Sequence, residues 1–440
     1  MQRCKGYFLL VEVTRMSILI QNTKAYVGEY LTLTSCHLYV DNEGVMSIID
    51  VTKDHLNEEQ LKAEIILNGE KLMVMPAFSD IHVHFREPGF EQKETLETGQ
   101  IAAIRGGVTQ VCTMPNTKPP IDRVERLIHY QNLVQNRSFI EILPSVAITL
   151  NQEGEEITDL EKLAELGAVA YTDDGRTVMS EEILKQSLKI SQITQKVVMT
   201  HSEDHELAKA YPDKPYPPEV ESEIVERDIQ ILENYGGKLH IAHLSTEASL
   251  KAVKRGKEKK LNVTCEVSPH HLYFDSEKLE FQSAKYKVNP PLRNEINRQA
   301  LIKGVKEGHI DAIASDHAPH EEASKTTNYQ NGAYGFTGIE TMFSVVNTVF
   351  KEADIPMQTL IQMMSINPRK ILGQAIAIIE NGAKANFVCI DADQEWTVQT
   401  EDIHSKSKNS PWIGQTLTGK VVHLVKNEKL LLKGGNVHVS

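Results

Sequence analysis

The chain has 440 residues, 40% of them hydrophobic and 24% charged, so it is long enough for one large globular domain and a smaller one. No apolar run is long enough to cross a bilayer, and a net charge of −13 argues against a nucleic-acid surface. The five cysteines are scattered and odd in number, which disfavours a disulfide framework and predicts a reducing, cytoplasmic location.

The first part of the chain is predicted to be a small β domain. Residues 1–16 are expected to form an N-terminal extension, and residues 17–75 contain short apolar runs separated by polar turns. Strands are predicted at 18–20, 31–33, 38–40 and 48–51.

Residues 378–440 show the same pattern at the other end of the chain. Strands are predicted at 386–391, 396–398, 420–425 and 430–432. Because a β element lies at each end, we expect the two to pair into one β-sandwich.

Residues 76–377 alternate strand-like apolar runs with helical patterns, which favours an α/β fold with a parallel sheet. The predicted strands are Gln110–Met114, Ile140–Leu143, Ala168–Tyr171, Val197–Thr200, Leu239–Ala242, Asn262–Cys265 and Ala312–Ser315. The run Leu72–Met75 brings them to the eight that a TIM barrel needs.

The stretch Asp80-Ile-His-Val-His-Phe-Arg-Glu-Pro-Gly89 follows an apolar run, so His82 and His84 are expected at or just beyond the end of a strand. Residues two apart on a strand point to the same side, and the two imidazoles can therefore meet one metal ion. A single histidine at a strand end is more often structural. Here an acidic residue, an arginine and a Pro-Gly turn accompany the pair, and together they favour a binding site.

Polar residues also follow most of the other predicted strands. They are Pro115-Asn-Thr117, Thr172-Asp-Asp-Gly175, His201, His243 and Asp316-His-Ala-Pro-His320. Each alone has an ordinary reading as a turn, a helix cap or a core histidine. Five in succession predict a site at the carboxyl ends of the strands, where barrel enzymes carry their chemistry.

The donor set of this predicted site is imidazole and carboxylate, which suits zinc. Four histidines are more than one catalytic zinc takes, so two metal ions that share a carboxylate are expected. Such a pair would acidify a water molecule and polarise a carbonyl, and a neighbouring aspartate could carry the proton.

In combination, these motifs are highly specific. The motifs are Asp80–Gly89, Met114-Pro-Asn-Thr117, Thr172–Gly175, His201-Ser-Glu-Asp204, His243-Leu-Ser-Thr246, Ser268-Pro-His-His271, Asn289-Pro-Pro-Leu-Arg293 and Asp316–His320. From about Ile18 to the C-terminus the chain resembles the bacterial class I dihydroorotases of the amidohydrolase superfamily. The resemblance implies a distorted TIM (β/α)8 barrel beside a β-sandwich made from both chain ends. It also implies the reversible cyclisation of N-carbamoyl-L-aspartate to (S)-dihydroorotate, a step of pyrimidine (UMP) biosynthesis.

The resemblance further implies a ligand set for two zinc ions per chain. The first zinc would be held by His82, His84 and Asp316, and the second by His201 and His243. Asp174 would bridge the two ions, although the sequence leaves Asp173 open as an alternative. Asp316 would also act as the general acid/base.

On the substrate side, the resemblance assigns Arg86, Asn116 and His320 to the α-carboxylate, Asn289 to the ring, and the backbone around Tyr334 and Gly335 to closure over the substrate. An arginine suits this task because its guanidinium matches a carboxylate with two parallel hydrogen bonds. Ala333-Tyr-Gly335 differs from the Pro-Phe/Ala-Gly usual in the family, so the contacts of this loop are left open. His270 and His271 are expected to orient the site or to pack beneath it.

Two other functions compete with this prediction. A hydantoinase or allantoinase would use a similar metal pair, but Arg86 and the Asp-Asp-Gly segment argue against both. A non-catalytic scaffold for a partner such as aspartate transcarbamoylase would have lost metal ligands, and none is missing from the sequence. The expected assembly is a homodimer, with an association with aspartate transcarbamoylase left open.

Overall fold

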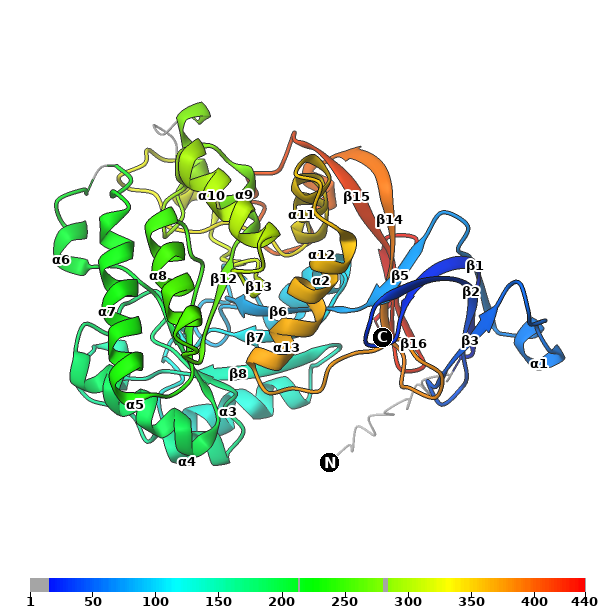
Figure 1. Ribbon diagram of the computed structural model, residues 1–440, viewed down its shortest axis with the longest axis horizontal. Coiled ribbons are helices and arrows are strands. Elements are labelled where there is room, and N and C mark those ends of the chain that lie inside the picture. Colours follow the sequence, from blue (N-terminus) through cyan, green and yellow to red (C-terminus); the bar gives the residue numbers. More distant parts are fainter. Residues whose placement is uncertain (1–15, 213, 280–283, 440) are drawn as a thin grey trace, which may run out of the picture.

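The computed structural model describes residues 16–439 except 213 and 280–283, so the predicted N-terminal extension lies outside the described residues apart from Met16. The described chain forms a barrel of strands surrounded by helices, with a second sheet packed beside it (Figure 1). Within this part of the chain, no helix combines the length and the apolar character that a bilayer span requires.

Eight parallel strands form the barrel in chain order, each hydrogen-bonded to the next. They are β6 (Phe78–Val83), β7 (Val108–Thr113), β8 (Glu141–Val146), β9 (Ala170–Tyr171), β10 (Val197–Thr200), β11 (Leu239–Ile241), β12 (Val263–Val267) and β13 (Ala312–Ile313). The ring closes where Val83 forms a parallel bridge with His317 and the backbone N–H of His84 donates to His317 O at 2.9 Å. This seam brings the ends of the first and last strands together.

All the predicted barrel strands but one are confirmed. The prediction for Leu72–Met75 as a barrel strand was wrong, because residues 73–75 belong to β5 (Met73–Pro76), a strand of the second sheet. The barrel begins after Ala77 with β6, whose residues are all buried. A continuous apolar run crosses from one sheet to the other, so the sequence pattern could not show where the first sheet ends.

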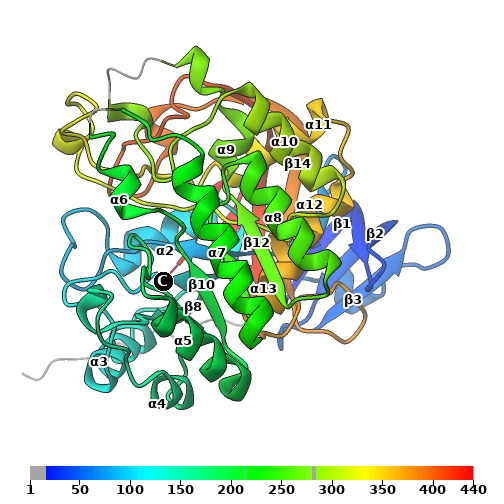
Figure 2. The ribbon, with the colours of Figure 1, turned by 60° about the vertical axis from the view of Figure 1, so that its left-hand side comes forward.

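Helices cover the outside of the barrel (Figures 1 and 2). They are α2 (Leu96–Arg105), α3 (Val124–Gln135), α4 (Leu160–Glu165), α5 (Glu181–Thr194), α6 (His205–Ala208), α7 (Glu219–Tyr235), α8 (Glu247–Glu258), α9 (Pro269–Tyr273), α10 (Glu295–Lys306), α11 (Met342–Glu352), α12 (Met357–Ile361) and α13 (Asn367–Ile371). Several begin at a residue whose side chain accepts from the first turn: Thr95 caps α2, Ser180 caps α5 and Thr246 caps α8. Such caps satisfy N–H groups that have no partner inside the helix.

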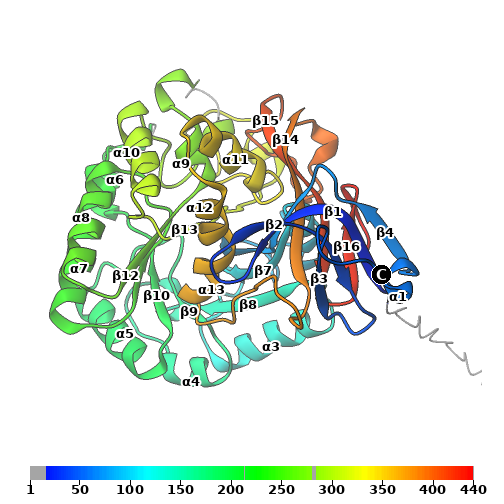
Figure 3. The same ribbon diagram turned by 45° about the vertical axis from the view of Figure 1, so that its right-hand side comes forward.

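The second sheet combines both chain ends, as predicted (Figure 3). Its strands are β1 (Ile18–Val27), β2 (Thr32–Val40), β3 (Met46–Asp50), β4 (Ile65–Asn68), β5, β14 (Asn386–Thr397), β15 (Thr416–Lys426), β16 (Lys429–Lys433) and β17 (Asn436–Val437), and the short helix α1 (Glu58–Leu61) precedes β4. The two ends join where β5 runs antiparallel to β14, with Met75 opposite Val388. Side chains from both halves share one core that includes Ile20, Leu38 and Phe387.

Two details of the predicted end domains are corrected. The runs 31–33 and 38–40 belong largely to one strand, β2, and the runs 386–391 and 396–398 to one strand, β14. In β14 the pairing with β15 shifts register between Asp391 and Glu395. Polar residues at such an irregularity resemble a turn in the sequence although the strand continues.

Candidate active site

The histidine pair of the first motif lies at the carboxyl end of β6, as predicted. His82 is the penultimate residue of the strand and fully buried, and His84 follows the strand directly. Asp80 Oδ1 accepts hydrogen bonds from the backbone N–H groups of His82 (3.2 Å) and Ser315 (3.1 Å), which ties β6 to the segment after β13. Burial raises the pKa of Asp80 to about 6.

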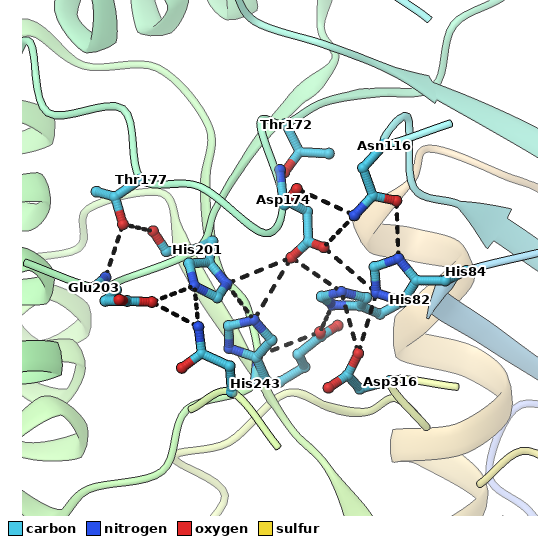
Figure 4. A network of polar contacts seen from close by, with 12 residues as sticks. His82, His84, Asn116, Thr172, Asp174, Thr177, His201, Glu203, His243 and Asp316 are labelled. Carbon is cyan, nitrogen blue, oxygen red and sulfur yellow. Dashed lines mark hydrogen bonds and ion pairs between the residues drawn. The ribbon is translucent and has the colours of Figure 1, made fainter. Parts of the chain in front are cut away.

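Asp174, which follows β9, lies between the four predicted metal-binding histidines (Figure 4). Its Oδ1 is 3.2 Å from His82 Nε2, 3.6 Å from His201 Nδ1 and 3.6 Å from His243 Nε2, and its Oδ2 is 3.4 Å from His84 Nε2. The histidines come from the ends of three strands, so the barrel brings together residues that are far apart in the sequence.

Asp173 points elsewhere. Its Oδ1 accepts from the backbone N–H groups of Ile148 (2.8 Å) and Thr149 (3.1 Å), and its Oδ2 accepts from the Thr149 hydroxyl. Of the two aspartates that the sequence left open, Asp174 is therefore the one that reaches the histidines.

Asp316 closes the cluster on the side of the first histidine pair. Its Oδ1 is 3.3 Å from His84 Nε2 and 3.8 Å from His82 Nε2. The backbone φ of Asp316 is +48°, and Arg86 (+63°) and His243 (+31°) are also left-handed. Such φ values are uncommon for residues other than glycine and gather at functional sites, where the fold holds them in place.

The buried charges shift one another's protonation. Burial alone would lower the pKa of His82, but Asp174 and Glu266 raise it well above its usual value. Burial would lower the pKa of His201, but the nearby carboxylates of Asp174 and Glu203 outweigh it and raise the pKa to about 9. Burial would raise the pKa of Asp174, whereas His82 and the other imidazoles hold it well below its usual range. The cluster therefore favours cations close to Asp174.

Two buried atoms of the cluster that make no hydrogen bond fit metal ions. Among the described residues, neither His82 Nε2 nor Asp174 Oδ1 has a hydrogen-bond partner, although both are buried. Two sets of side chains each offer ligand atoms within 4.8 Å of one another: His82, His84 and Asp316, and His82, Asp174 and His243. His201 Nδ1 lies beside the second set, 2.9 Å from His243 Nε2. Buried polar atoms without partners are costly, and a cation that binds them removes that cost.

A cavity of about 290 Å³ opens onto the cluster. All six residues predicted to bind substrate line it: Arg86, Asn116, Asn289, His320, Tyr334 and Gly335. They share its wall with His84, Asp174, His201, His243 and Asp316. The structure therefore brings the predicted substrate-side residues, and the predicted metal-side residues except His82, to the wall of one cavity.

Arg86, Asn116 and His320 form the side of the cavity next to His84. Arg86 Nε donates to Pro319 O at 3.2 Å, and Arg86 Nη2 is 3.2 Å from His320 Nε2. Burial and the nearby guanidinium lower the pKa of His320 to about 2, so its ring is neutral at pH 7. Asn116 Oδ1 is 3.0 Å from His84 Nδ1, a contact that orients the imidazole in addition to the predicted role toward substrate.

Gly335 lies where a side chain has no room. Its φ is +110°, and a Cβ atom there would be 2.5 Å from the Cβ of Ala318. Its backbone N–H donates to Lys287 O at 3.0 Å. The glycine therefore lets the loop approach Ala318 at the wall of the cavity.

Glu266 and Asn409 are further residues of the site that the sequence prediction missed. Glu266, in β12, is fully buried and lies 2.7 Å from His82 Nδ1 and 3.2 Å from His240 Nε2. A glutamate inside an apolar strand run was the available signal. Asn409 Oδ1 accepts from the backbone N–H of His320 (3.3 Å), and its Nδ2 donates to Gly335 O (3.4 Å). No motif marks Asn409, because it comes from a loop between β14 and β15.

The sequence is similar to known dihydroorotases over most of its length. A family model described as dihydro-orotase-like matches residues 71–249. A dihydroorotase from Caldicellulosiruptor saccharolyticus is 37% identical over 419 residues, which cover 92% of this chain and 97% of that protein. A dihydroorotase from Bacillus subtilis is 37% identical over 386 residues, which cover 85% of this chain and 90% of that protein.

Solved structures of related folds superpose closely. An L-hydantoinase (dihydropyrimidinase) from Arthrobacter aurescens gives a TM-score of 0.86 at 20% identity, with 96% of this chain and 98% of that chain covered. A dihydropyrimidinase from Brevibacillus agri gives a TM-score of 0.83 at 20% identity, with 96% of each chain covered. At this identity the likeness establishes the fold, a TIM barrel with an added sheet.

Proposed function

The chain belongs to the dihydroorotase family, and from this premise we propose that it interconverts N-carbamoyl-L-aspartate and (S)-dihydroorotate at a pair of zinc ions. It is a cyclic amidohydrolase, and its buried imidazole and carboxylate groups suit a metal cofactor. The observation that carries the proposal is the convergence of four histidines on Asp174.

In this proposal His82, His84 and Asp316 hold one zinc, and His201 and His243 hold the other, with Asp174 between them. The ions would acidify a water molecule and polarise the carbonyl that is attacked. Glu266 fixes the His82 ring through Nδ1, which leaves Nε2 directed at Asp174. Asn116 does the same for His84. Supporting contacts of this kind orient metal ligands and set their tautomers.

Asp316 is the proposed proton carrier. In hydrolysis it accepts the proton of the attacking water and donates it to the departing amide nitrogen, and in cyclisation it carries the proton in the opposite direction. Its carboxylate lines the cavity next to His84, so it is within reach of a bound ring. Arg86, Asn116 and His320 would hold the α-carboxylate, with two parallel hydrogen bonds from the guanidinium.

Rates with dihydroorotate, hydantoin and allantoin, measured side by side on the zinc-loaded protein, test the proposal. We expect dihydroorotate to be hydrolysed at least about 100-fold faster than the other two, because only dihydroorotate offers Arg86 a carboxylate to pair with. Equal or faster turnover of hydantoin would contradict the proposal.

The remaining parts of the proposal concern the setting of the enzyme. We propose that it works in the cytoplasm, in pyrimidine biosynthesis, as a homodimer, and we keep an association with aspartate transcarbamoylase as a further possibility. Sedimentation of the protein alone and mixed with aspartate transcarbamoylase tests both statements. A single species with the mass of one 49.4 kDa chain would contradict the homodimer.

A further inference from the structure

Asn289 occupies the wall of the cavity beside His201, and its amide is held at both ends. Its Nδ2 donates to Glu203 Oε2 at 2.6 Å and lies 3.2 Å from His201 Nε2. Its Oδ1 accepts from the hydroxyl of Tyr216 at 2.7 Å. The amide is therefore part of a fixed network and not a freely rotating group.

The partners determine which end of the amide carries the hydrogens. A carboxylate only accepts hydrogen bonds, so Glu203 requires the NH₂ end of Asn289. The opposite end must then be the oxygen, and Tyr216 must donate to it. Burial raises the pKa of Tyr216 well above its usual value, so the hydroxyl keeps its proton. An amide turned the other way would face Glu203 with its oxygen.

One of the two Nδ2 hydrogens remains available to a ligand. His201 directs Nδ1 toward Asp174 and His243, the side on which a metal ion would bind. An imidazole whose Nδ1 binds a metal ion would carry its proton on Nε2, which lies 3.3 Å from Glu203 Oε2. In that tautomer Nε2 cannot accept from Asn289. One Nδ2 hydrogen goes to Glu203, and the other can face the cavity that Asn289 lines.

Tyr216 itself is firmly positioned. Its side chain is buried and its backbone carbonyl accepts from Arg293 Nη1 at 2.5 Å. Arg293 also donates to Ser245 Oγ and lies 3.7 Å from Glu221, near the start of α7. On the other side of Asn289, His271 Nε2 donates to Pro290 O at 3.1 Å. Tyr216 and the backbone of Pro290, the two groups next to Asn289, are thus both held by buried polar side chains.

We propose that Tyr216 is a positioning residue that turns the N–H end of the Asn289 amide toward the substrate and so selects a ligand with a carbonyl oxygen at this place. This inference rests on the proposed function, in which the ureido carbonyl of the substrate is that acceptor. Tyr216 does not line the cavity. It acts only through Asn289.

Tyr216→Phe tests the proposal, because it removes the donor and keeps the ring. We expect the KM for dihydroorotate to rise about tenfold, the effect of losing one well-placed hydrogen bond, while kcat changes less than about twofold. The matched control is Tyr130→Phe. Tyr130 is also buried and donates to Thr113 Oγ1 at 2.8 Å, away from the cavity, so the KM of Tyr130→Phe should stay at the wild-type value.

Asn289→Ala completes a double-mutant cycle. If Tyr216 acts through the amide, Tyr216→Phe adds no further loss once Asn289 has been truncated. Affinity for N-carbamoyl-L-aspartate, measured by calorimetry in an Asp316→Asn background, gives the same comparison without turnover. Should Tyr216→Phe not fold, Asn289→Asp is measured in its place. Its carboxylate would face the substrate carbonyl with a second acceptor, so Asn289→Asp should bind substrate more weakly than Asn289→Ala.

An unchanged KM in Tyr216→Phe, or losses that add in the double variant, would overturn the proposal. Substrate binding by Asn289→Asp that is as tight as that of the wild type would overturn it as well. Failure of the proposed function is a separate result, because wild-type protein would then show no turnover of dihydroorotate before any variant is compared.

Discussion

Two buried histidine–carboxylate clusters lie next to each other at the carboxyl end of β13. The consecutive residues Asp316 and His317 belong to different clusters. Asp316 belongs to the cluster around Asp174, whereas His317 turns away and pairs with Glu94 (Nε2 to Oε2, 3.3 Å). His82, His317 and Glu94 are all 0% exposed, so burial alone does not distinguish the clusters.

The clusters differ in how their polar atoms are satisfied. His317 Nδ1 accepts from the Gly338 N–H at 3.3 Å, and Glu94 accepts from the Lys406 N–H at 3.0 Å and from the hydroxyls of Thr98 and Ser405. In the Asp174 cluster, among the described residues, His82 Nε2 and Asp174 Oδ1 have no hydrogen-bond partner. A satisfied cluster stabilises the fold, whereas an unsatisfied one is suited to bind an ion.

The largest effect is expected from Asp316→Asn, which changes one carboxylate oxygen in the unsatisfied cluster. If Asp316 is the proton carrier, turnover should fall at least about 1,000-fold in both directions while substrate still binds. Rates in each direction and calorimetric affinity measure this. Near-wild-type rates would remove Asp316 from the role of proton carrier.

The variants Asp174→Asn and Asp173→Asn remove adjacent carboxylates, one that faces the histidines and one that accepts from backbone N–H groups. Asp174→Asn should lower kcat/KM at least about 100-fold and reduce the zinc content, because an amide would be a poor ligand between the two proposed zinc ions. Asp173→Asn should keep both zinc ions and lose about 1 kcal/mol of unfolding free energy, since Asp173 binds N–H groups of the 148–149 backbone. Elemental analysis and urea unfolding distinguish them, and a loss of zinc in both variants would contradict the assignment.

Glu94→Gln tests the satisfied cluster. The Gly338 N–H requires His317 Nδ1 to accept, so Nε2 carries a proton. The NH₂ group of a glutamine would therefore face either His317 Nε2–H or the Lys406 N–H, and both of these groups donate. We expect a loss of about 1–3 kcal/mol of unfolding free energy, with zinc content unchanged and kcat within about threefold of wild type. A loss of zinc here would mean that the two clusters are not separate.

His423, in β15, is a buried histidine outside both clusters. We expect it to lower the free energy of unfolding only at acidic pH. Burial, together with Lys433, lowers its pKa to about 4, and Nδ1 accepts from the Gly434 N–H. Because the folded pKa lies below the unfolded value of about 6.5, its contribution to stability is present above that value and is lost as the pH falls toward 4.

Between pH 7.5 and pH 5 this loss amounts to about 2 kcal/mol. His423→Asn keeps an acceptor for Gly434 but does not titrate, so its unfolding free energy should fall less over the same range. Urea unfolding of both proteins at the two pH values provides the measurement. Parallel losses in the two proteins would contradict the assignment.

Much of the fold and of the site could be predicted from the sequence because strand ends carry local signals. His82, His84, His201 and His243 each follow or end an apolar run, and the parallel barrel brings such ends together. The boundary between β5 and β6 could not be predicted, since the apolar run from Met73 to Phe78 continues across it.

Contacts across the fold were not predictable in the same way. The choice of Asp174 over Asp173 depends on which backbone N–H groups lie nearby in space. Tyr216 and Asn409 reach Asn289 and His320 from loops without a recognisable motif. Their roles follow from hydrogen bonds between segments that are distant in the sequence.

Metal content of the purified wild-type protein, determined by elemental analysis beside His82→Ala, tests the central claim most directly. The wild type should contain two zinc ions per chain, and His82→Ala, which lacks a ligand of the first ion, should contain about one. Wild-type protein that is active with dihydroorotate yet holds no metal after exhaustive chelation would contradict the account.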